Sequence, residues 1–480
     1  QTVSFHGTFT AKRTAEVEWA FHVGGDTVPA GTVFTFDNMS LICTDNDEYD
    51  YVPTQEWQRA DIVTNQIGYF PDCRKQATLI SDETDAVDFS LCDESGKEVY
   101  TGASKPMGED PDSGDSVHIL DFSEFKEAGT YTLRAGDAAS REFAIGGTEV
   151  YSGMLFDALN YFYQNRSGIA IESQYITSGD AAALARSAGH SNDTARITTD
   201  WDDLQSNGGS QDVSGGWYDA GDHGKYVVNG GIALWMMQNQ YERAVSRKTE
   251  DSYADDTMQI PEQQNGYPDL LDEARWEMEW MLKMIVQDGT YQGMAYHKVH
   301  DIKWTALGMA PADDQEERIL KPPTTCATLN LAACAAQAAR LWEPYDADFA
   351  KECLTAAENA YEAAKKHDDL YAPLDQSIGG GPYGDDCADD EFYWAACELY
   401  LTTGEKAYLK DLEKSDLAYT VPATLSAGED ADTAGSFDWG NTAALGTLSL
   451  ALHKDDLEKK AARRSQTPLQ MLQMCTSAGR

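Results

Sequence analysis

The chain has 480 residues, which is enough for two or three domains with sizeable cores, and its 42% of hydrophobic residues excludes intrinsic disorder. Its formal net charge of -45 at pH 7 argues against binding to nucleic acid or to anionic membrane surfaces, and favours calcium ions or neutral partners such as carbohydrate. The nine cysteines form no Cys-x-x-Cys pair and no Cys/His cluster at zinc spacing, and no apolar run is long enough to span a membrane.

Residues 1–50 alternate between apolar and polar side chains as β-strands do, with no helical period. The run Phe36-Asp37-Asn38-Met39-Ser40-Leu41 resembles the last strand of a jelly-roll carbohydrate-binding module. Fifty residues are too few for eight strands, so residues 1–50 are predicted to be the back part of such a module. A small strand-rich extension that packs on the next domain is the alternative. The acidic, polar residues 51–61 are predicted to be a linker.

Residues 62–147 contain seven short runs typical of strands, separated by turn signals. This spacing predicts an antiparallel β-sandwich. The runs collect no acids, bases or metal ligands, so we expect the sandwich to pack against the domain that follows it.

The hydrophobic period changes from two to 3.6 near Tyr151. Amphipathic helices are predicted within residues 148–480, at 151–162, 271–285, 328–342, 346–366, 390–402 and 442–453. Long loops rich in Gly, Pro and Asp lie between them, and loops of this kind above a helical scaffold are typical of a functional site. Periodicity alone therefore predicts an all-α domain.

The stretch Gly-Gly-Trp-Tyr-Asp-Ala-Gly-Asp-His-Gly-Lys-Tyr-Val-Val-Asn-Gly-Gly at residues 215–231 sets Asp219 and Asp222 three residues apart. Two carboxylates at one point repel, so one pKa tends to rise while the other group stays ionised, which suits general-base work on water. In a chain with 81 acidic residues, however, an Asp-x-x-Asp is more often a solvated turn or a helix cap. Trp217 is expected to pack in the core beneath this loop.

This stretch resembles the signature of glycoside hydrolase family nine, the inverting cellulases, in the subgroup with an immunoglobulin-like module before the catalytic domain. Further stretches resemble the same family in the same order, at residues 166–169, 188–190, 265–277, 297–304, 379–395 and 437–442. The resemblance implies a multidomain fold in which an immunoglobulin-like β-sandwich precedes an all-α (α/α)6 toroid.

The resemblance also implies roles for individual residues. Asp222 matches the catalytic base, and Asp219 matches the partner acid that helps to hold the attacking water. His300 and Trp304 match a sugar-contacting pair, and Tyr383 is a further candidate contact. For His300, a core histidine with satisfied hydrogen bonds is the alternative.

An acidic cluster just before a predicted helix resembles the calcium loop of the family, which implies Ca²⁺ at Asp386, Asp390 and Glu391. Acids that interact with the helix dipole are the alternative. Asn441 stands where relatives often carry Asp. The zinc of some relatives is held by cysteines and histidines, and since Ser167 and the run ending at His190 contain no cysteine, no such zinc is predicted.

The resemblance fades after Leu450, and the motif that supplies the general acid in the family normally lies beyond this point, so the toroid is expected to be incomplete. The resemblance implies a secreted β-1,4-glucanase (endoglucanase) that acts on cellulose or mixed-linkage β-glucan polymers or oligosaccharides. A non-catalytic glucan-binding protein and an exo-acting cellobiohydrolase or glucosaminidase are the alternatives.

Overall fold

The computed structural model describes residues 33, 59–201, 205–306, 308–375, 378–425 and 431–454. The chain divides into two compact units, Gln1–Arg59 and Ala60–Arg480, and the fold below is that of the second. The module predicted at residues 1–50, nearly all of the predicted linker and everything after Lys454 lie outside the described residues. Within those residues, no helix combines the length and the apolar character needed to cross a membrane.

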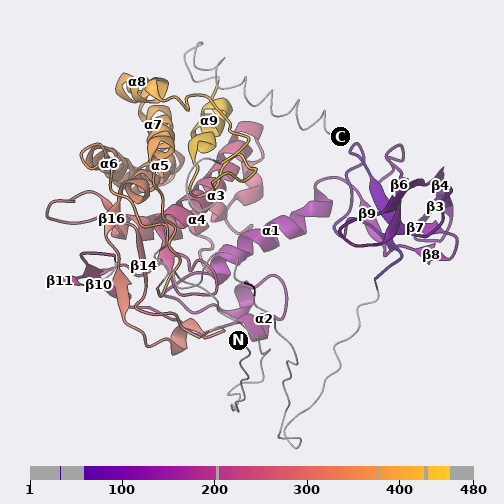
Figure 1. Cartoon of the computed structure of the whole chain (residues 1–480), viewed down its shortest axis with the longest axis horizontal. Coiled ribbons are helices and arrows are strands. Elements are labelled where there is room, and N and C mark those ends of the chain that lie inside the picture. Colours follow the sequence, from indigo (N-terminus) through magenta and orange to yellow (C-terminus); the bar gives the residue numbers. More distant parts are fainter. Residues whose placement is uncertain are drawn as a thin grey trace, which may run out of the picture. The chain divides into compact units, whose positions relative to one another are not determined.

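The first part of this unit is a β-sandwich of two sheets (Figure 1). One sheet has the order β1-β2-β6-β5 and the other has the order β4-β3-β7-β8, with β9 also paired to β7. The alternating residues of the strands supply a shared core that includes Leu79, Leu91, Leu120 and Leu133. The strands are β1 (Ile62–Val63), β2 (Gln76–Ile80), β3 (Asp88–Asp93), β4 (Glu98–Ala103), β5 (Lys105–Glu109), β6 (Ser116–Asp121), β7 (Gly129–Ala135), β8 (Ala138–Ala139) and β9 (Phe143–Ile145). The predicted sandwich is therefore confirmed.

Helices dominate the rest of the unit, as predicted. Helix α5 is buried along nearly its whole length, and its many alanines let α3, α6 and α7 pack closely around it. Helix α3 was not predicted, because the Asn229-Gly230-Gly231 run near its start is unfavourable for helix formation. The helices are α1 (Glu149–Gln164), α2 (Ala181–Leu184), α3 (Val227–Arg247), α4 (Asp269–Lys283), α5 (Thr325–Trp342), α6 (Ala347–Ala364), α7 (Asp389–Thr403), α8 (Lys406–Lys414) and α9 (Ala443–Leu452).

The loops of the helical part form a small sheet, which the all-α prediction from periodicity did not include. Its order is β11-β10-β15-β14-β12, with β10 and β15 parallel and the other pairs antiparallel. These strands are too short for a period of two to stand out in the sequence. They are β10 (Thr194–Thr198), β11 (Ser206–Asp212), β12 (Lys225–Tyr226), β14 (Lys298–Asp301) and β15 (Arg318–Leu320), and β13 (Ala295–Tyr296) pairs with β16 (Pro323–Thr324) beside them.

Strand β12 leads directly into α3, so the Asp-rich loop before it is held at the edge of this sheet. The register of the sheet also sets Asp301 of β14 opposite Arg318 of β15. The sheet thus fixes the positions of charged side chains beneath the loop.

Candidate active site

The first residues of the loop that carries Asp219 and Asp222 pack closely against α4. Gly216 has a φ of 74°, and a Cβ at this position would lie 2.6 Å from the ring of Trp280, so only glycine fits. The backbone N–H of Trp217 donates to Glu277 Oε2 at 2.8 Å, and its indole N–H donates to Glu273 Oε1 at 2.9 Å. Trp217 is buried, as predicted, and anchors the loop to α4.

Both carboxylate oxygens of Asp219 accept hydrogen bonds. Asn229 donates its side-chain N–H to Oδ1 at 2.8 Å, and the Tyr383 hydroxyl donates to Oδ2 at 2.6 Å. Burial raises the pKa of Asp219, the negative charge of Asp222 adds to this effect, and the two donors oppose it. Asp219 is thus held firmly in one orientation.

Asp222 is bonded differently, because both of its donors reach the same oxygen. The hydroxyl of Tyr226 donates to Asp222 Oδ2 at 2.5 Å, and the backbone N–H of Gly224 donates to it at 3.1 Å. Oδ1 of Asp222 receives no hydrogen bond from the described residues, and the side chain is half-buried. One oxygen is therefore fixed while the other is left to solvent.

The tyrosines that bind the two carboxylates contact each other. The rings of Tyr226 and Tyr383 lie edge to face with centroids 4.7 Å apart, and Tyr383 also contacts Trp439 at 5.3 Å. Tyr383 has a φ of 46°, which is uncommon for a residue with a side chain and turns it toward Asp219. The loop at residues 379–383 therefore closes against the Asp219 and Asp222 loop.

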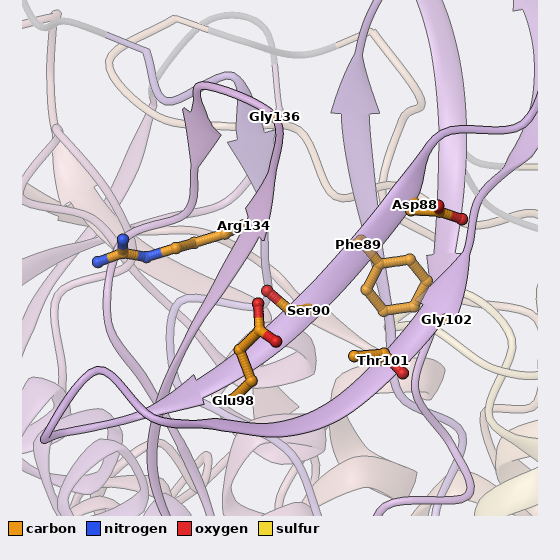
Figure 2. A pocket seen from close by; sticks show the side chains of 8 residues that line it. All are labelled: Asp88, Phe89, Ser90, Glu98, Thr101, Gly102, Arg134 and Gly136. Atoms are coloured by element: carbon orange, nitrogen blue, oxygen red, sulfur yellow. The ribbon is translucent and has the colours of Figure 1, made fainter.

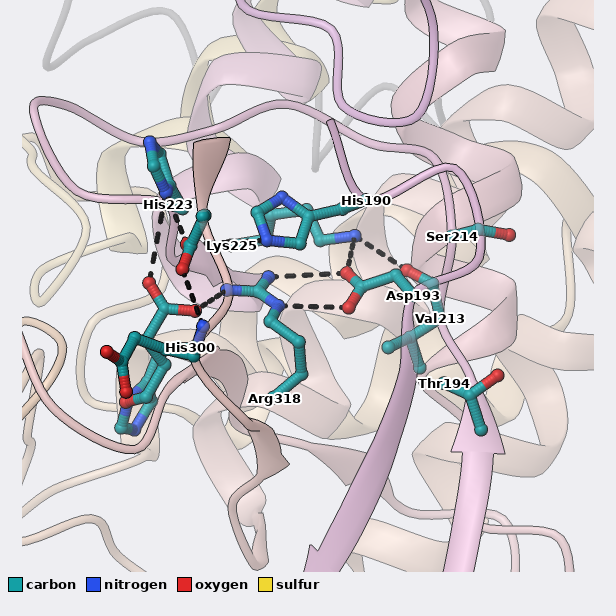
Figure 3. Close-up of polar contacts among 12 residues, drawn as sticks. His190, Asp193, Thr194, Val213, Ser214, His223, Lys225, His300 and Arg318 are labelled. Atoms are coloured by element: carbon teal, nitrogen blue, oxygen red, sulfur yellow. Dashed lines mark hydrogen bonds and ion pairs between the residues drawn. The ribbon is translucent and has the colours of Figure 1, made fainter. Parts of the chain in front are cut away.

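A buried network of charges lies beneath this arrangement (Figure 3). Lys225 donates to Asp193 at 2.8 Å, and Arg318 binds Asp193 at 2.9 Å and Asp301 at 2.9 Å. Although burial alone would raise it, the charges of Lys225 and Arg318 hold the pKa of Asp193 well below its usual range. Lys225 also donates to the backbone oxygen of Gly215 at 2.8 Å, so the network ties both ends of the loop together. Removing one partner of such a buried pair costs about 3–5 kcal/mol.

Two histidines beside the network lie close enough together, with Asp314, to hold a metal ion. Their contacts are nevertheless those of a hydrogen-bonded cluster. His223 Nδ1 lies 2.6 Å from Asp314 Oδ2 and its Nε2 lies 3.2 Å from the Met309 oxygen, while His190 Nδ1 lies 2.7 Å from the Tyr218 hydroxyl. Burial, reinforced by the positive charge of Arg318, lowers the pKa of His190 to about 4. His190 is therefore neutral at pH 7 within this network.

The predicted sugar-contacting pair is split between the interior and the surface. His300 is fully buried in β14, and a Cβ on Gly380 would lie 2.8 Å from its ring. Its Nδ1 lies 2.7 Å from the Asp301 oxygen, and its Nε2 has no hydrogen-bond partner among the described residues. Trp304, by contrast, is 51% exposed. A direct sugar contact by His300 stays a prediction, and Trp304 is the member of the pair that is open to a ligand.

The acidic cluster before α7 differs in one position from the predicted set. Asp390 and Glu391 are buried, but Asp386 is exposed and Asp385 is buried in its place. Hydrogen bonds from the backbone N–H groups of residues 386 and 387 to Asp385 Oδ1 turn that side chain inward. A calcium ligand at Asp386 stays a prediction, and Asp385 is the buried acid next to it.

The cluster has more buried carboxylate oxygens than hydrogen-bond donors to them. Asp385 Oδ2 and both oxygens of Glu391 receive no hydrogen bond from the described residues, and Cys326 Sγ lies within 4.8 Å of this group. Asp390 accepts a hydrogen bond from the N–H of Thr442 at 2.6 Å. Burial raises the pKa of Asp385 to about 7 and that of Glu391 well above its usual value.

Two cavities lie away from both acidic groups. One, of about 540 Å³, lies on the β-sandwich and is lined by residues of β3, β4 and β7, with Glu98 and Arg134 on either side of Ser90 (Figure 2). The other, of about 570 Å³, lies between α3 and α9, where Trp235, Met236 and Leu452 line it. Neither includes a residue of the Asp219 and Asp222 loop.

Tyr226, Asn229, Asp193 and Arg318 were not singled out from the sequence. Tyr226 and Asn229 belong to the same motif as Asp222, and their spacing across the junction of strand and helix could have indicated them. Asp193 and Arg318 are 125 residues apart, and no local pattern pairs them.

Comparisons with known proteins show which family the chain belongs to. A model described as "Glycosyl hydrolase family 9" matches residues 151–478, and one described as "Cellulase N-terminal ig-like domain" matches residues 58–140. A cellulose 1,4-beta-cellobiosidase of Acetivibrio thermocellus is 44% identical over 475 residues, which cover 92% of this chain and 52% of that protein. Endoglucanase C of Cellulomonas fimi is 45% identical over 462 residues, which cover 94% of this chain and 40% of that protein. The chain thus spans about half the length of these relatives or less.

Solved structures of family 9 glycoside hydrolases are also similar to this chain. A family 9 glycoside hydrolase of Bacteroides ovatus is 32% identical with a TM-score of 0.73, over 86% of this chain and 72% of that one. A Zn-binding triple mutant of the family 9 endoglucanase J30 is 27% identical with a TM-score of 0.70, over 84% and 70%. The enzyme AaCel9A, solved in complex with cellobiose-like isofagomine, is 25% identical with a TM-score of 0.67, over 85% and 70%.

Proposed function

Because the chain belongs to glycosyl hydrolase family 9, we propose that it hydrolyses β-1,4-glucosidic bonds in cellulose or mixed-linkage β-glucans by a single displacement with inversion. The printed names of its relatives, a cellobiosidase and an endoglucanase, support this class of substrate. The observation that carries the proposal is the unequal bonding of the two carboxylates. Asp219 has a donor on each oxygen, whereas Asp222 has both of its donors on Oδ2.

This difference assigns the two roles. In a single displacement, one carboxylate takes a proton from water as the oxygen attacks the anomeric carbon. Oδ1 of Asp222 is the oxygen with free lone pairs, and its side chain is accessible to water, so Asp222 is the base. Asp219 keeps one orientation through Asn229 and Tyr383, and its remaining lone pairs accept the second hydrogen of that water.

Substrate contacts are proposed at Trp304 and Tyr383. The exposed ring of Trp304 offers an apolar face on which a glucose unit can stack, and Tyr383 lies beside Asp219. His300 supports the loop at residues 379–383 from below. The glycosidic oxygen gains a proton as its bond to the anomeric carbon breaks. We assign no general acid for this step among the described residues.

The acidic cluster before α7 fits a structural calcium ion. Hard cations bind several carboxylate oxygens, and here Glu391 and Asp385 present three buried oxygens without donors. We propose that Asp385, Asp390 and Glu391 hold Ca²⁺, which would supply the positive charge that the cluster lacks. An enzyme meets a glucan polymer outside the cell. We therefore propose that the protein is secreted and binds calcium.

Reducing-end release from a soluble cellulose derivative tests the proposed function. The wild-type chain is expected to release reducing ends at a rate well above that of Asp222→Ala. Asp348→Ala is the matched control, because it removes an exposed aspartate on α6, away from the loop, and should leave the rate unchanged.

The same assay separates the alternatives. Glucan binding without release above the Asp222→Ala rate would contradict the proposal and favour a non-catalytic glucan-binding protein. Product profiles on a long oligosaccharide then distinguish endo from exo action, since early release of a single short product indicates an exo-acting enzyme.

A further inference from the structure

We propose that Tyr226 is a positioning residue that fixes Oδ2 of Asp222 and so selects Oδ1 as the atom that receives the proton from water. This inference rests on the proposed function and adds a residue to it. Tyr226 is 2% exposed and therefore acts on a substrate only through Asp222.

The direction of the hydrogen bond follows from the contacts of the hydroxyl. Its oxygen accepts the backbone N–H of Gly381 at 2.8 Å and lies 2.5 Å from Asp222 Oδ2. A phenol has one hydrogen to donate, and the Gly381 N–H is already a donor toward the oxygen. The hydrogen of Tyr226 is therefore directed at Asp222.

The backbone at Gly224 and Gly380 packs closely around the Tyr226 hydroxyl. A Cβ on Gly380 would lie 2.7 Å from the Tyr226 oxygen, and a Cβ on Gly224 would overlap both that oxygen and Asp222 Oδ2. The ring is held by the edge of Tyr383 and by the pairing of Tyr226 with Lys298 between β12 and β14. The hydroxyl is thus preorganised before any substrate binds.

Two consequences follow for the reaction. With Tyr226 and Gly224 both on Oδ2, the carboxylate of Asp222 cannot rotate without losing two charge-assisted bonds. The bond from Gly381 also ties Tyr226 to the loop that presents Tyr383 to Asp219. Tyr226 therefore sets the position of the base relative to the acid that holds the water.

Simple core packing is the competing explanation, and the substitution Tyr226→Phe separates the two. Phenylalanine keeps the ring contacts and removes only the hydroxyl. The matched control is Tyr241→Phe on α3, which removes a buried hydroxyl that lies 2.6 Å from the Tyr345 hydroxyl, away from the acidic loop.

The experiment measures kcat and KM on a soluble β-glucan across pH for the wild-type chain and both variants. A hydrogen bond to a charged group is worth about 1.5–3 kcal/mol, so Tyr226→Phe is expected to lower kcat about 10- to 100-fold. KM should change less than about twofold, because the hydroxyl does not touch the substrate. The acid limb of the kcat profile should move to higher pH, since the carboxylate loses a donor that favours its ionised form. Tyr241→Phe should leave kcat and the profile unchanged.

An unchanged kcat and acid limb in Tyr226→Phe, with an active wild-type chain that depends on Asp222, would overturn the role of Tyr226 and leave the proposed function intact. An inactive wild-type chain would overturn both. If Tyr226→Phe does not fold, 3-fluorotyrosine at position 226 replaces it as a stronger donor of nearly the same size. It is expected to move the acid limb to lower pH, and no movement or the opposite movement would overturn the inference.

Discussion

The loop at Asp219 and Asp222 and the cluster at Asp385, Asp390 and Glu391 are both groups of acids close in sequence, but they differ in their partners. The loop carboxylates are half-buried, and each is bonded by its own tyrosine. The cluster carboxylates are buried, and three of their oxygens have no donor. The two groups of acids therefore differ in their hydrogen-bond donors and in their access to solvent, and for this reason we propose a base in the first and a bound cation in the second.

The sharpest test of this comparison changes one acid in each region. Asp222→Asn is expected to lower kcat about 10²- to 10⁴-fold, the usual contribution of a general base, with an unchanged melting temperature. Glu391→Gln is expected to leave kcat unchanged and to shift the melting temperature and its dependence on calcium. Initial rates and thermal melts of both variants check this, and a large loss of kcat in both with unchanged melts would remove the distinction.

Removal of calcium should affect only the cluster. A chelator is expected to lower the melting temperature of the wild-type chain by about 5 °C, because a ligand at 100 times its Kd stabilises by about 2.7 kcal/mol. The Glu391→Gln variant should respond much less, and Asp222→Asn should respond as the wild type does. Equal melts with and without chelator in the wild type would contradict a calcium site.

Glu277, which supports the acidic loop through the N–H of Trp217, should make stability depend on pH. Burial raises its pKa to about 8, so between about pH 4.5 and pH 8 the folded chain keeps a proton that the unfolded chain has lost. Stability therefore falls as pH rises through this range. Glu277→Gln keeps an acceptor for Trp217 and should flatten this fall, measured as the melting temperature at pH 5, 6.5 and 8. A slope as steep as that of the wild type would argue against a proton on Glu277.

The smallest expected effect is at Trp304, the exposed member of the predicted sugar-contacting pair. Trp304→Ala should raise KM about 3- to 10-fold with little change in kcat, because a lost stacking contact is worth about 1 kcal/mol. Trp304→Phe keeps an aromatic face and should recover most of the loss. An unchanged KM in Trp304→Ala would remove this residue from the proposed site.

The sequence predicted what local pattern encodes. Alternation predicted the sandwich at residues 62–147, and the 3.6-residue period predicted helices close to α5, α6, α7 and α9. The motif resemblance predicted an immunoglobulin-like module before an (α/α)6 domain, which the family models and the solved structures confirm. Both signals depend on residues close together in the chain.

What the sequence did not predict depends on distant contacts. The small sheet beneath the loop joins strands of two to seven residues from separate loops, and its register pairs Asp301 with Arg318. Asp385 could not be chosen over Asp386, because the inward turn is set by two backbone hydrogen bonds. The spacing of Tyr226 from Asp222 could have indicated this residue, but its contact with Gly381, which lies 155 residues away, has no local signal.

The configuration of the first product tests the central claim most directly, because activation of water by Asp222 in one displacement fixes the stereochemistry. Proton NMR during the first minutes of hydrolysis of a soluble β-1,4-glucan should show the α-anomer of the new reducing end forming first, followed by the β-anomer through mutarotation. The β-anomer forming first would mean retention through a covalent intermediate, and would contradict the assignment of Asp222 as the base that activates water.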